Sequence, residues 1–315
     1  MNISNILWLL AGLMLLLISG KYLVESSVLI ARKFRISPGI IGLTIVAFGT
    51  SAPELLVSMQ AAIQGHPDMA VGNVIGSNIS NILLVLGLTT MIFPLVVKRS
   101  SIVHDWPVMF FLTLLLLVFL LDNRITRVEG VVLVLLLMVY VIVSVRQSRR
   151  QEKEVPHEAV KLRNDRWWAA IVIFLVSCAG LAFGASLLVD NASVMAQHLG
   201  VSERVISITM IAVGTSLPEM VTSLIAAFKK ETEISIGNIL GSNIMNIISV
   251  LGITALIKPI TTVREVLTID MPWMLGAGVI LLLFMLPANK GRINRFEGTV
   301  MLLGYASYIY FIFII

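Results

Sequence analysis

Hydrophobic residues fill long stretches of this chain, and short polar segments separate these stretches at similar intervals. Runs such as Phe110 to Leu121 and Val131 to Val145 contain no charged residue. A helix needs about 20 mostly apolar residues to cross the hydrocarbon core of a bilayer. The pattern therefore predicts an all-α integral membrane protein with ten transmembrane helices, near residues 5–30, 37–63, 70–96, 106–121, 128–146, 168–189, 202–228, 235–257, 270–286 and 297–314.

The only long polar stretch runs from Arg146 to Arg166 and is rich in Lys and Arg. It is too short to form a folded domain, and basic loops favour the cytoplasmic side of a membrane. If this stretch is cytoplasmic, alternate loops share that side and contain most of the Lys and Arg residues, and both termini lie outside. We expect three parts: a first five-helix repeat (1–146), a cytoplasmic linker (147–167) and a second, inverted five-helix repeat (168–315).

The composition supports a membrane protein. Hydrophobic residues make up 57% of the chain and charged residues only 13%, whereas soluble domains carry about 25% charged residues. The net charge of +5 is spread in small groups between apolar segments, which indicates a lipid bilayer as partner and no nucleic acid. A single cysteine, Cys178, excludes a disulfide within the chain. Nothing in the sequence indicates a cofactor or an obligatory protein partner.

An internal repeat is the strongest feature of the sequence. GLTIVAFGTSAPELLVS begins at Gly42, and SITMIAVGTSLPEMVTS begins 165 residues later at Ser207. The same offset takes GNVIGSNISNILLVLG, from Gly72, to GNILGSNIMNIISVLG, from Gly237. Each copy holds five predicted helices, an odd number, so the second copy must have the opposite orientation in the membrane. Transporters with inverted repeats bind substrate near the midplane, on helices interrupted by Gly or Pro.

Glu54 and Glu219 occupy matching positions deep within apolar segments. An ionisable residue at this depth costs roughly 3 kcal/mol on insertion scales and is functional in most cases. No Lys or Arg lies at the same depth in these segments. A bound cation, a proton, or both would compensate the charge; permanently protonated acids between helices are the purely structural alternative.

The residues around the two glutamates indicate an oxygen-rich cation site. Pro53 and Pro218 lack an N–H and should free backbone carbonyl groups one turn earlier in their helices. Small and polar residues follow helical spacing on two stripes in each half, namely Ala47, Thr50 and Glu54 with Asn73, Ser77 and Asn81, and Ala212, Thr215 and Glu219 with Asn238, Ser242 and Asn246. Carboxylate, hydroxyl, amide and carbonyl oxygens suit calcium and sodium rather than soft transition metals. Gly72, Gly76, Gly237 and Gly241 are expected to serve helix packing. Asn78 and Asn243, next to the stripe, could bind an ion or join two helices.

The motifs GTSAPE and GTSLPE, together with GNVIGSN and GNILGSN, resemble those of the sodium/calcium exchanger family. The resemblance covers almost the whole chain. It implies a prokaryotic-type antiporter in the plasma membrane in which Glu54 and Glu219 bind calcium together with the Thr50 and Thr215 carbonyls. It also implies sodium sites that use these residues with Ala47, Ser51, Ser77 and Asn81 and with Ala212, Ser216, Ser242 and Asn246. Potassium-dependent relatives resemble a form with an acid at position 246, so Asn246 argues against potassium transport.

Several functions remain open at this stage. The resemblance implies an electrogenic exchange of three sodium ions for one calcium ion by alternating access, with no enzymatic activity. A proton/calcium antiporter would use the same glutamates, and a passive cation channel would share the ligands. An intramembrane hydrolase is disfavoured, because Ser51 and Ser216 have no histidine or lysine at membrane depth to activate them.

Overall fold

The computed structural model describes residues 3–34, 36–152, 167–198, 212–286 and 291–314, and almost all of them are helical. The α-helices of the first half are α1 (Ile3–Phe34), α2 (Pro38–Ile41), α3 (Ala47–Thr50), α4 (Ala52–Gln64), α5 (Pro67–Ser80), α6 (Gly87–Ile92), α7 (Trp106–Phe119) and α8 (Arg127–Glu152). Those of the second half are α9 (Trp167–His198), α11 (Ala212–Thr215), α12 (Leu217–Phe228), α13 (Thr232–Met245), α14 (Gly252–Ile257), α15 (Met271–Met285) and α16 (Arg295–Ile314).

Turns of π-helix join several of these helices into longer rods. They are η1 (Gly42–Val46), η2 (Asn81–Leu86), η3 (Ser101–Asp105), η6 (Asn246–Leu251) and η7 (Val266–Asp270). Each π-turn inserts one residue into the helical hydrogen-bond ladder, and such turns are frequent at functional sites. η2 and η6 begin at Asn81 and Asn246, which are matching positions of the repeat.

α8 and α16, the last long helices of the two halves, begin with matching caps. At the start of α8, the Thr126 N–H donates to Glu129 Oε2 (2.6 Å) and the Glu129 N–H donates to Thr126 Oγ1 (3.3 Å). At the start of α16, the Asn294 N–H donates to Glu297 Oε2 (2.6 Å) and the Glu297 N–H donates to Asn294 Oδ1 (3.2 Å). These reciprocal bonds form a capping box, which satisfies two otherwise free N–H groups.

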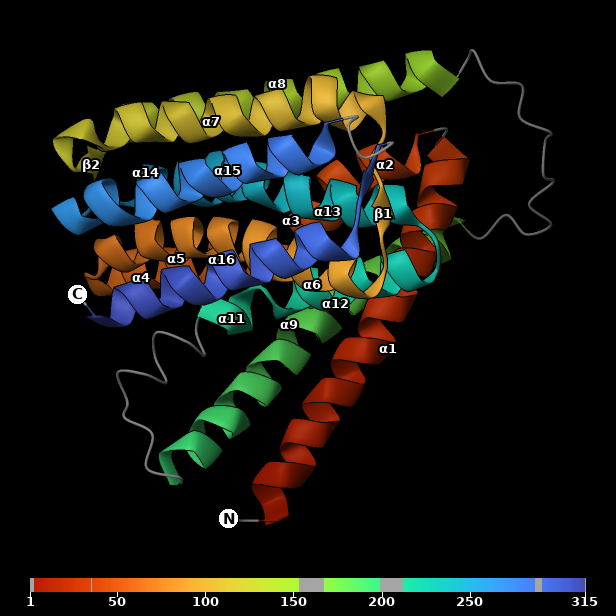
Figure 1. Cartoon of the computed structure of the whole chain (residues 1–315), viewed down its shortest axis with the longest axis horizontal. Coiled ribbons are helices and arrows are strands. Elements are labelled where there is room, and N and C mark those ends of the chain that lie inside the picture. The colour runs from red at the N-terminus through yellow and green to blue at the C-terminus, as the bar shows by residue number, and fades with distance from the viewer. Residues whose placement is uncertain (1–2, 35, 153–166, 199–211, 287–290, 315) are drawn as a thin grey trace.

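The two long helices α1 and α9 form a pair that runs at a steep angle to the other helices (Figure 1). Their backbones approach closely at glycines. A Cβ atom added at Gly12 would lie 2.9 Å from the Gly184 carbonyl oxygen, and one at Gly184 would lie 3.1 Å from the Gly12 carbonyl oxygen. Small residues allow this close packing between membrane helices.

The centre of the protein is a crossing between the two halves, where α13 packs against α2, η1 and α3. A Cβ atom at Gly237 would lie 2.5 Å from the Gly39 carbonyl oxygen, and one at Gly241 would lie 2.5 Å from the Leu43 carbonyl oxygen. The predicted packing role is therefore confirmed for these two glycines. Their repeat partners Gly72 and Gly76 have no neighbour within 4 Å of such an atom among the described residues, so that part of the prediction stays open.

Two short antiparallel strand pairs also join the halves. β1 (Leu95–Val96) pairs with β4 (Arg292–Ile293), so that Leu95 lies opposite Ile293. β2 (Arg124–Ile125) pairs with β3 (Ile260–Thr261), so that Ile125 lies opposite Ile260. Figure 1 shows β1 and β2 at opposite ends of the helices. Each pair thus links one half to the other at one end of the molecule.

The expected class, an all-α protein with apolar membrane helices, is confirmed. Within the described residues, seven helices are long and apolar enough to cross a membrane, or eight if the bent pair Pro38–Thr50 and Ala52–Gln64 counts as one. The predicted span 202–228 lies partly outside the described residues, and the shorter apolar helix Leu217–Phe228 covers its second part. α16 covers the last predicted span. The number of ten spans, and their inversion, stay predictions.

Three boundaries differ clearly from the sequence interpretation. The predicted span 70–96 ends as a helix at Ile92, and Leu95–Val96 forms strand β1. α8 continues to Glu152, six residues into the predicted linker. α9 continues to His198, well beyond the predicted end of its span at 189. Helices extend past the apolar segment because Gln, Ser, Asn and Ala at a helix end tolerate helical geometry, and the edge of the membrane does not end a helix.

Candidate functional site

Each half contains a broken helix, and the break lies three residues before the glutamate. Ser51 has φ −83° and ψ 6°, outside the helical region, and separates α3 from α4. Ser216 has φ −84° and ψ 0° and separates α11 from α12. In the first half the two segments meet at 42°. A proline in the first turn of α4 and α12 explains these breaks, because it has no N–H and crowds the preceding turn.

Glu54 and Glu219 lie in the first turns of α4 and α12 and are fully buried, with 0% exposure. Ten other residues were predicted as ligands. Thr50, Asn81, Ser242 and Asn246 are also fully excluded from solvent, and Ala47, Ser51, Ser77, Ser216 and Thr215 are buried. Ala212 begins α11, and only its place in the chain is described. The structure thus buries all of these side chains that it describes.

Hydrogen bonds join the breaks of the two halves. The Ser51 hydroxyl donates to Glu219 Oε1 (3.2 Å), so the carboxylate of the second half lies against the break of the first. Thr50 Oγ1 lies 3.3 Å from Ser242 Oγ. The matching pair in the opposite direction is Ser77 Oγ with Thr215 Oγ1, also at 3.3 Å. The structure therefore brings residues from both copies of the repeat into one buried cluster.

Several oxygens of this cluster are buried and have no hydrogen-bond partner among the described residues. Six of them belong to the predicted ligands, namely Glu54 Oε1 and Oε2, Asn81 Oδ1, Ser216 Oγ, Glu219 Oε2 and Asn246 Oδ1. A buried polar atom without a partner is costly, and each such atom in a native structure needs an explanation. Calcium takes six to eight oxygen ligands. A cation bound by these oxygens would remove the cost.

Two asparagines next to the predicted ligands hold the amides of those ligands in place. Asn246 Nδ2 donates to Asn78 Oδ1 (3.0 Å), and Asn81 Nδ2 donates to Asn243 Oδ1 (3.4 Å). Asn78 Nδ2 also donates to the Asn243 carbonyl oxygen (3.2 Å). Of the two roles left open for Asn78 and Asn243, the structure shows the link between helices. Because the amide nitrogens of Asn81 and Asn246 are engaged, their amide oxygens remain available for a cation.

The amide nitrogens of Asn73 and Asn238 donate to the helix turns that carry Glu54 and Glu219. Asn238 also belongs to the cluster, because its Oδ1 accepts a hydrogen bond from Thr50 Oγ1. The positions of the two asparagines on their stripes gave no signal for these contacts, since spacing defines a helix face but does not identify what lies opposite it.

The chemistry of the cluster suits a hard cation. Within the described residues there is no group of three or more His, Cys, Asp or Glu residues that could hold a metal ion. Two carboxylates and neutral hydroxyl, amide and carbonyl groups are what the cluster offers. Such oxygens select calcium or sodium over softer metals.

The comparison with known families agrees with this chemistry. The family model described as sodium/calcium exchanger protein matches residues 4–146 and 169–314, nearly the whole chain in two segments. The chain belongs to the sodium/calcium exchanger family.

Relatives that match this exchanger over almost its whole length include bacterial and archaeal proteins. A putative antiporter, CaxA, from Alkalimonas amylolytica is 40% identical over 98% of both chains. The sodium/calcium exchanger MaX1 from Methanosarcina acetivorans is 32% identical over 99% of both chains. A solved structure of the sodium-calcium exchanger NCX_Mj has a TM-score of 0.83 and 32% identity, and the match covers 98% of this chain and 99% of that one. The exchanger is therefore a membrane transporter of the cation/calcium exchange class and not an enzyme.

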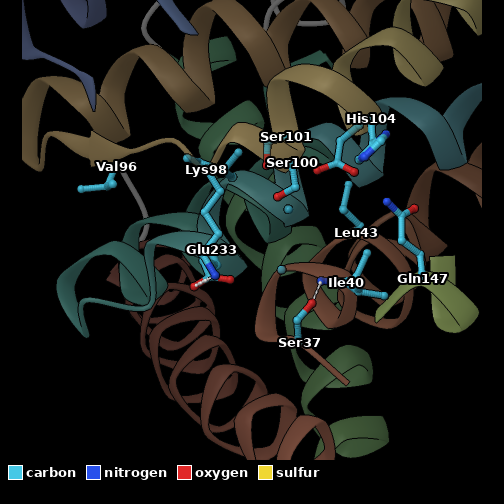
Figure 2. A pocket seen from close by; sticks show the side chains of 14 residues that line it. Ser37, Ile40, Leu43, Val96, Lys98, Ser100, Ser101, His104, Gln147 and Glu233 are labelled. Carbon is cyan, nitrogen blue, oxygen red and sulfur yellow. Dashed lines mark hydrogen bonds and ion pairs between the residues drawn. The ribbon is translucent and has the colours of Figure 1, made fainter. Parts of the chain in front are cut away.

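A separate pocket of about 60 Å³ lies beside the central crossing of the exchanger. Figure 2 shows Lys98 reaching Glu233 in this pocket, with 2.6 Å between Nζ and Oε1, and Ser37 accepting a hydrogen bond from the Ile40 N–H. The described residues that line the pocket include none of the predicted ligands. It is therefore distinct from the glutamate cluster, which is closed within the protein.

Proposed function

We propose that this protein exchanges calcium for sodium across a membrane by alternating access. One observation carries the proposal. Glu54 and Glu219 are fully buried in the first turns after matching helix breaks, and the Glu219 carboxylate accepts a hydrogen bond from Ser51, the break residue that precedes Glu54. Two buried carboxylates must be neutralised by a cation or by protons, because isolated buried charges are very costly. A single calcium ion would neutralise both.

In this proposal Glu54 and Glu219 bind one calcium ion between them, and the Thr50 and Thr215 carbonyls complete the site. The sodium ions use the same glutamates with the remaining predicted ligands, namely Ala47, Ser51, Ser77 and Asn81 in the first half and Ala212, Ser216, Ser242 and Asn246 in the second. Of the thirteen buried side-chain oxygens without a hydrogen-bond partner among the described residues, six belong to the predicted ligands, and these six support the assignment.

We further propose the arrangement of the chain in the membrane. Ten spans form two inverted five-helix repeats, the linker is cytoplasmic, both termini lie outside, and the membrane is a prokaryotic plasma membrane. The matching helix breaks and the strand pairs at opposite ends of the helices support the inversion. The complete burial of Glu54 and Glu219 means that ions need a movement of the surrounding helices to enter or leave.

Exchange of three sodium ions for one calcium ion would move one net positive charge per cycle, so we propose electrogenic transport that does not need potassium. The test is calcium uptake into sealed proteoliposomes that contain the purified protein. Imposed sodium, potassium and proton gradients are compared, with and without a clamped membrane potential. We expect calcium uptake against its own gradient when only a sodium gradient is imposed, and we expect the membrane potential to change its rate.

Other outcomes would identify other functions. Calcium uptake driven by a proton gradient and indifferent to sodium would identify a proton/calcium antiporter. Calcium movement that only follows its own gradient would identify a passive channel. Either result would overturn sodium coupling.

A further inference from the structure

Two asparagines outside the predicted ligand set make the same pair of contacts in both halves. Asn73 Nδ2 donates to the Glu54 carbonyl oxygen (3.4 Å) and to Ser58 Oγ (3.0 Å). Asn238 Nδ2 donates to the Glu219 carbonyl oxygen (3.4 Å) and to Ser223 Oγ (3.0 Å). The two sets of contacts have the same atoms and the same distances.

The geometry of these contacts fixes the turn that carries each glutamate. Glu54 and Ser58 are four residues apart, as are Glu219 and Ser223, so each pair lies one helical turn apart on a common face. An amide that binds both members of a pair sets the rotation of the helix about its axis and its height against the neighbouring helix. The direction of the glutamate side chain follows from both.

Asn238 has a third contact, which reaches the other half of the protein. Its Oδ1 accepts a hydrogen bond from Thr50 Oγ1 (3.1 Å), and both residues are fully buried. Thr50 is the last residue of α3, directly before the break at Ser51. One amide thus connects the turn of Glu219 with the broken helix that leads to Glu54.

We propose that Asn73 and Asn238 are positioning residues for ion binding, which hold Glu54 and Glu219 in place without contacting the ion. The inference rests on the proposed function, in which these glutamates bind calcium. The contacts with the glutamate turns use the amide nitrogens, which carry only donors and cannot bind a cation, and Asn238 Oδ1 already accepts a hydrogen bond from Thr50 Oγ1. Partners that orient metal ligands in this way affect affinity strongly, and their loss typically weakens it 10- to 100-fold.

The test measures sodium-driven calcium uptake in proteoliposomes as a function of calcium concentration. Asn238→Leu removes the hydrogen bonds at similar volume and is expected to raise the half-saturating calcium concentration about tenfold or more. The maximal rate should change far less, because the ligands themselves remain. Asn73→Leu should act in the same direction, because Asn73 makes the same two contacts in the first half.

Ser223→Ala gives a milder version of the same change, since it removes one contact and leaves the asparagine in place. It should raise the half-saturating calcium concentration severalfold. The double variant Asn238→Leu/Ser223→Ala should be no worse than Asn238→Leu alone, because the two residues act through one contact and such effects do not add. If the leucine variant fails to fold, Ser223→Ala and Ser58→Ala still provide the test.

Thr113→Val is the matched control. Thr113 is buried on α7, and its hydroxyl donates to the Met109 carbonyl oxygen within the same helix (3.0 Å). It should leave the half-saturating calcium concentration unchanged. A second readout is the rise in melting temperature on adding calcium, which Asn238→Leu should reduce and Thr113→Val should preserve.

An unchanged half-saturating calcium concentration in Asn238→Leu would overturn the inference, as would additive effects of Asn238→Leu and Ser223→Ala. The result is separable from the proposed function. Normal calcium exchange in Glu54→Gln or Glu219→Gln would overturn the ligand assignment itself. Loss of exchange in those variants with normal calcium dependence in Asn238→Leu would overturn the positioning role alone.

Discussion

Glu54 and Glu219 lie in matching sequence motifs, but their side chains have different surroundings. Glu219 Oε1 accepts hydrogen bonds from Ser51 (3.2 Å) and Ser242 (3.4 Å), one from each half of the protein. Both carboxylate oxygens of Glu54 are buried without a hydrogen-bond partner among the described residues. The contacts of the repeat are therefore only partly symmetric: Thr50 pairs with Ser242 as Thr215 pairs with Ser77, but the serine of one break alone binds the opposite carboxylate.

This difference indicates that the two carboxylates depend on a bound cation to different degrees. A buried carboxylate that accepts two hydrogen bonds is partly stabilised by the protein, whereas one without such bonds depends on the ion. Glu54 should then be the more costly residue in the absence of ions.

Replacing either glutamate by glutamine should have the largest effect. Glu54→Gln and Glu219→Gln each remove one of two negative charges from a buried site, and we expect calcium exchange to fall by about 100-fold or more. Calcium flux in proteoliposomes measures this. Near-normal exchange in either variant would contradict the role of that glutamate as a ligand.

The same variants should differ in stability, which addresses the comparison directly. In detergent without calcium or sodium, Glu54→Gln should raise the melting temperature more than Glu219→Gln, because it replaces a buried carboxylate that accepts no hydrogen bond from the described residues with a neutral amide. Equal shifts in the two variants would show that the carboxylates are equivalent in solution.

The glycine crossing should show the next largest effect. In Gly241→Ala the added Cβ would lie 2.5 Å from the Leu43 carbonyl oxygen, so the backbones must separate, at a cost of about 1–3 kcal/mol. Gly304→Ala is the control, since its Cβ would meet Leu83 at an ordinary 3.7 Å and alanine favours a helix. Melting temperatures should fall for the first and not for the second. The repeat predicts a similar fall for Gly76→Ala, and an unchanged melting temperature there would limit the symmetry of the crossing.

Serine variants should have a smaller effect that differs between the halves. Ser242 contacts both Thr50 and Glu219, whereas its repeat partner Ser77 contacts Thr215. Ser242→Ala should therefore raise the half-maximal sodium concentration more than Ser77→Ala does. The difference should be about a few fold, since a neutral hydrogen bond contributes about 1 kcal/mol. The sodium concentration that half-maximally drives calcium uptake measures both. A larger effect of Ser77→Ala would reverse the assigned asymmetry.

Potassium should have the smallest effect. Asn81 and Asn246 are matching amides, and both offer a buried Oδ1 with no hydrogen-bond partner among the described residues. With no acid at position 246, replacing potassium by choline should change sodium-driven calcium uptake less than about twofold, because a neutral amide attracts a further cation weakly. An absolute requirement for potassium would show that an amide at position 246 does not exclude potassium transport.

The helical membrane class and the two copies of the motif could be recognised from the sequence alone, and the structure confirms the class. The chemical type of the site was also predicted from the sequence and stays a prediction. These features are local: apolar length predicts a membrane helix, proline breaks a helix, and a carboxylate in an apolar segment needs a compensating charge. Glu54 and Glu219 could be selected for these reasons, Thr50 from its helical spacing to Glu54, and Ser51 only from the family resemblance; the structure places all four in one buried cluster.

Only the tertiary structure decided which groups meet across the two halves. Helical spacing shows that Asn73 shares a face with Ser77 and Asn81, yet it cannot show that the Asn73 amide turns to Ser58 and the Glu54 carbonyl. The π-turns that begin at Asn81 and Asn246, and the bond from Ser51 to Glu219, also had no signal in the sequence. The physical reason is that such contacts depend on how two helices cross, and the crossing is set by close backbone contacts at glycines from opposite halves of the chain.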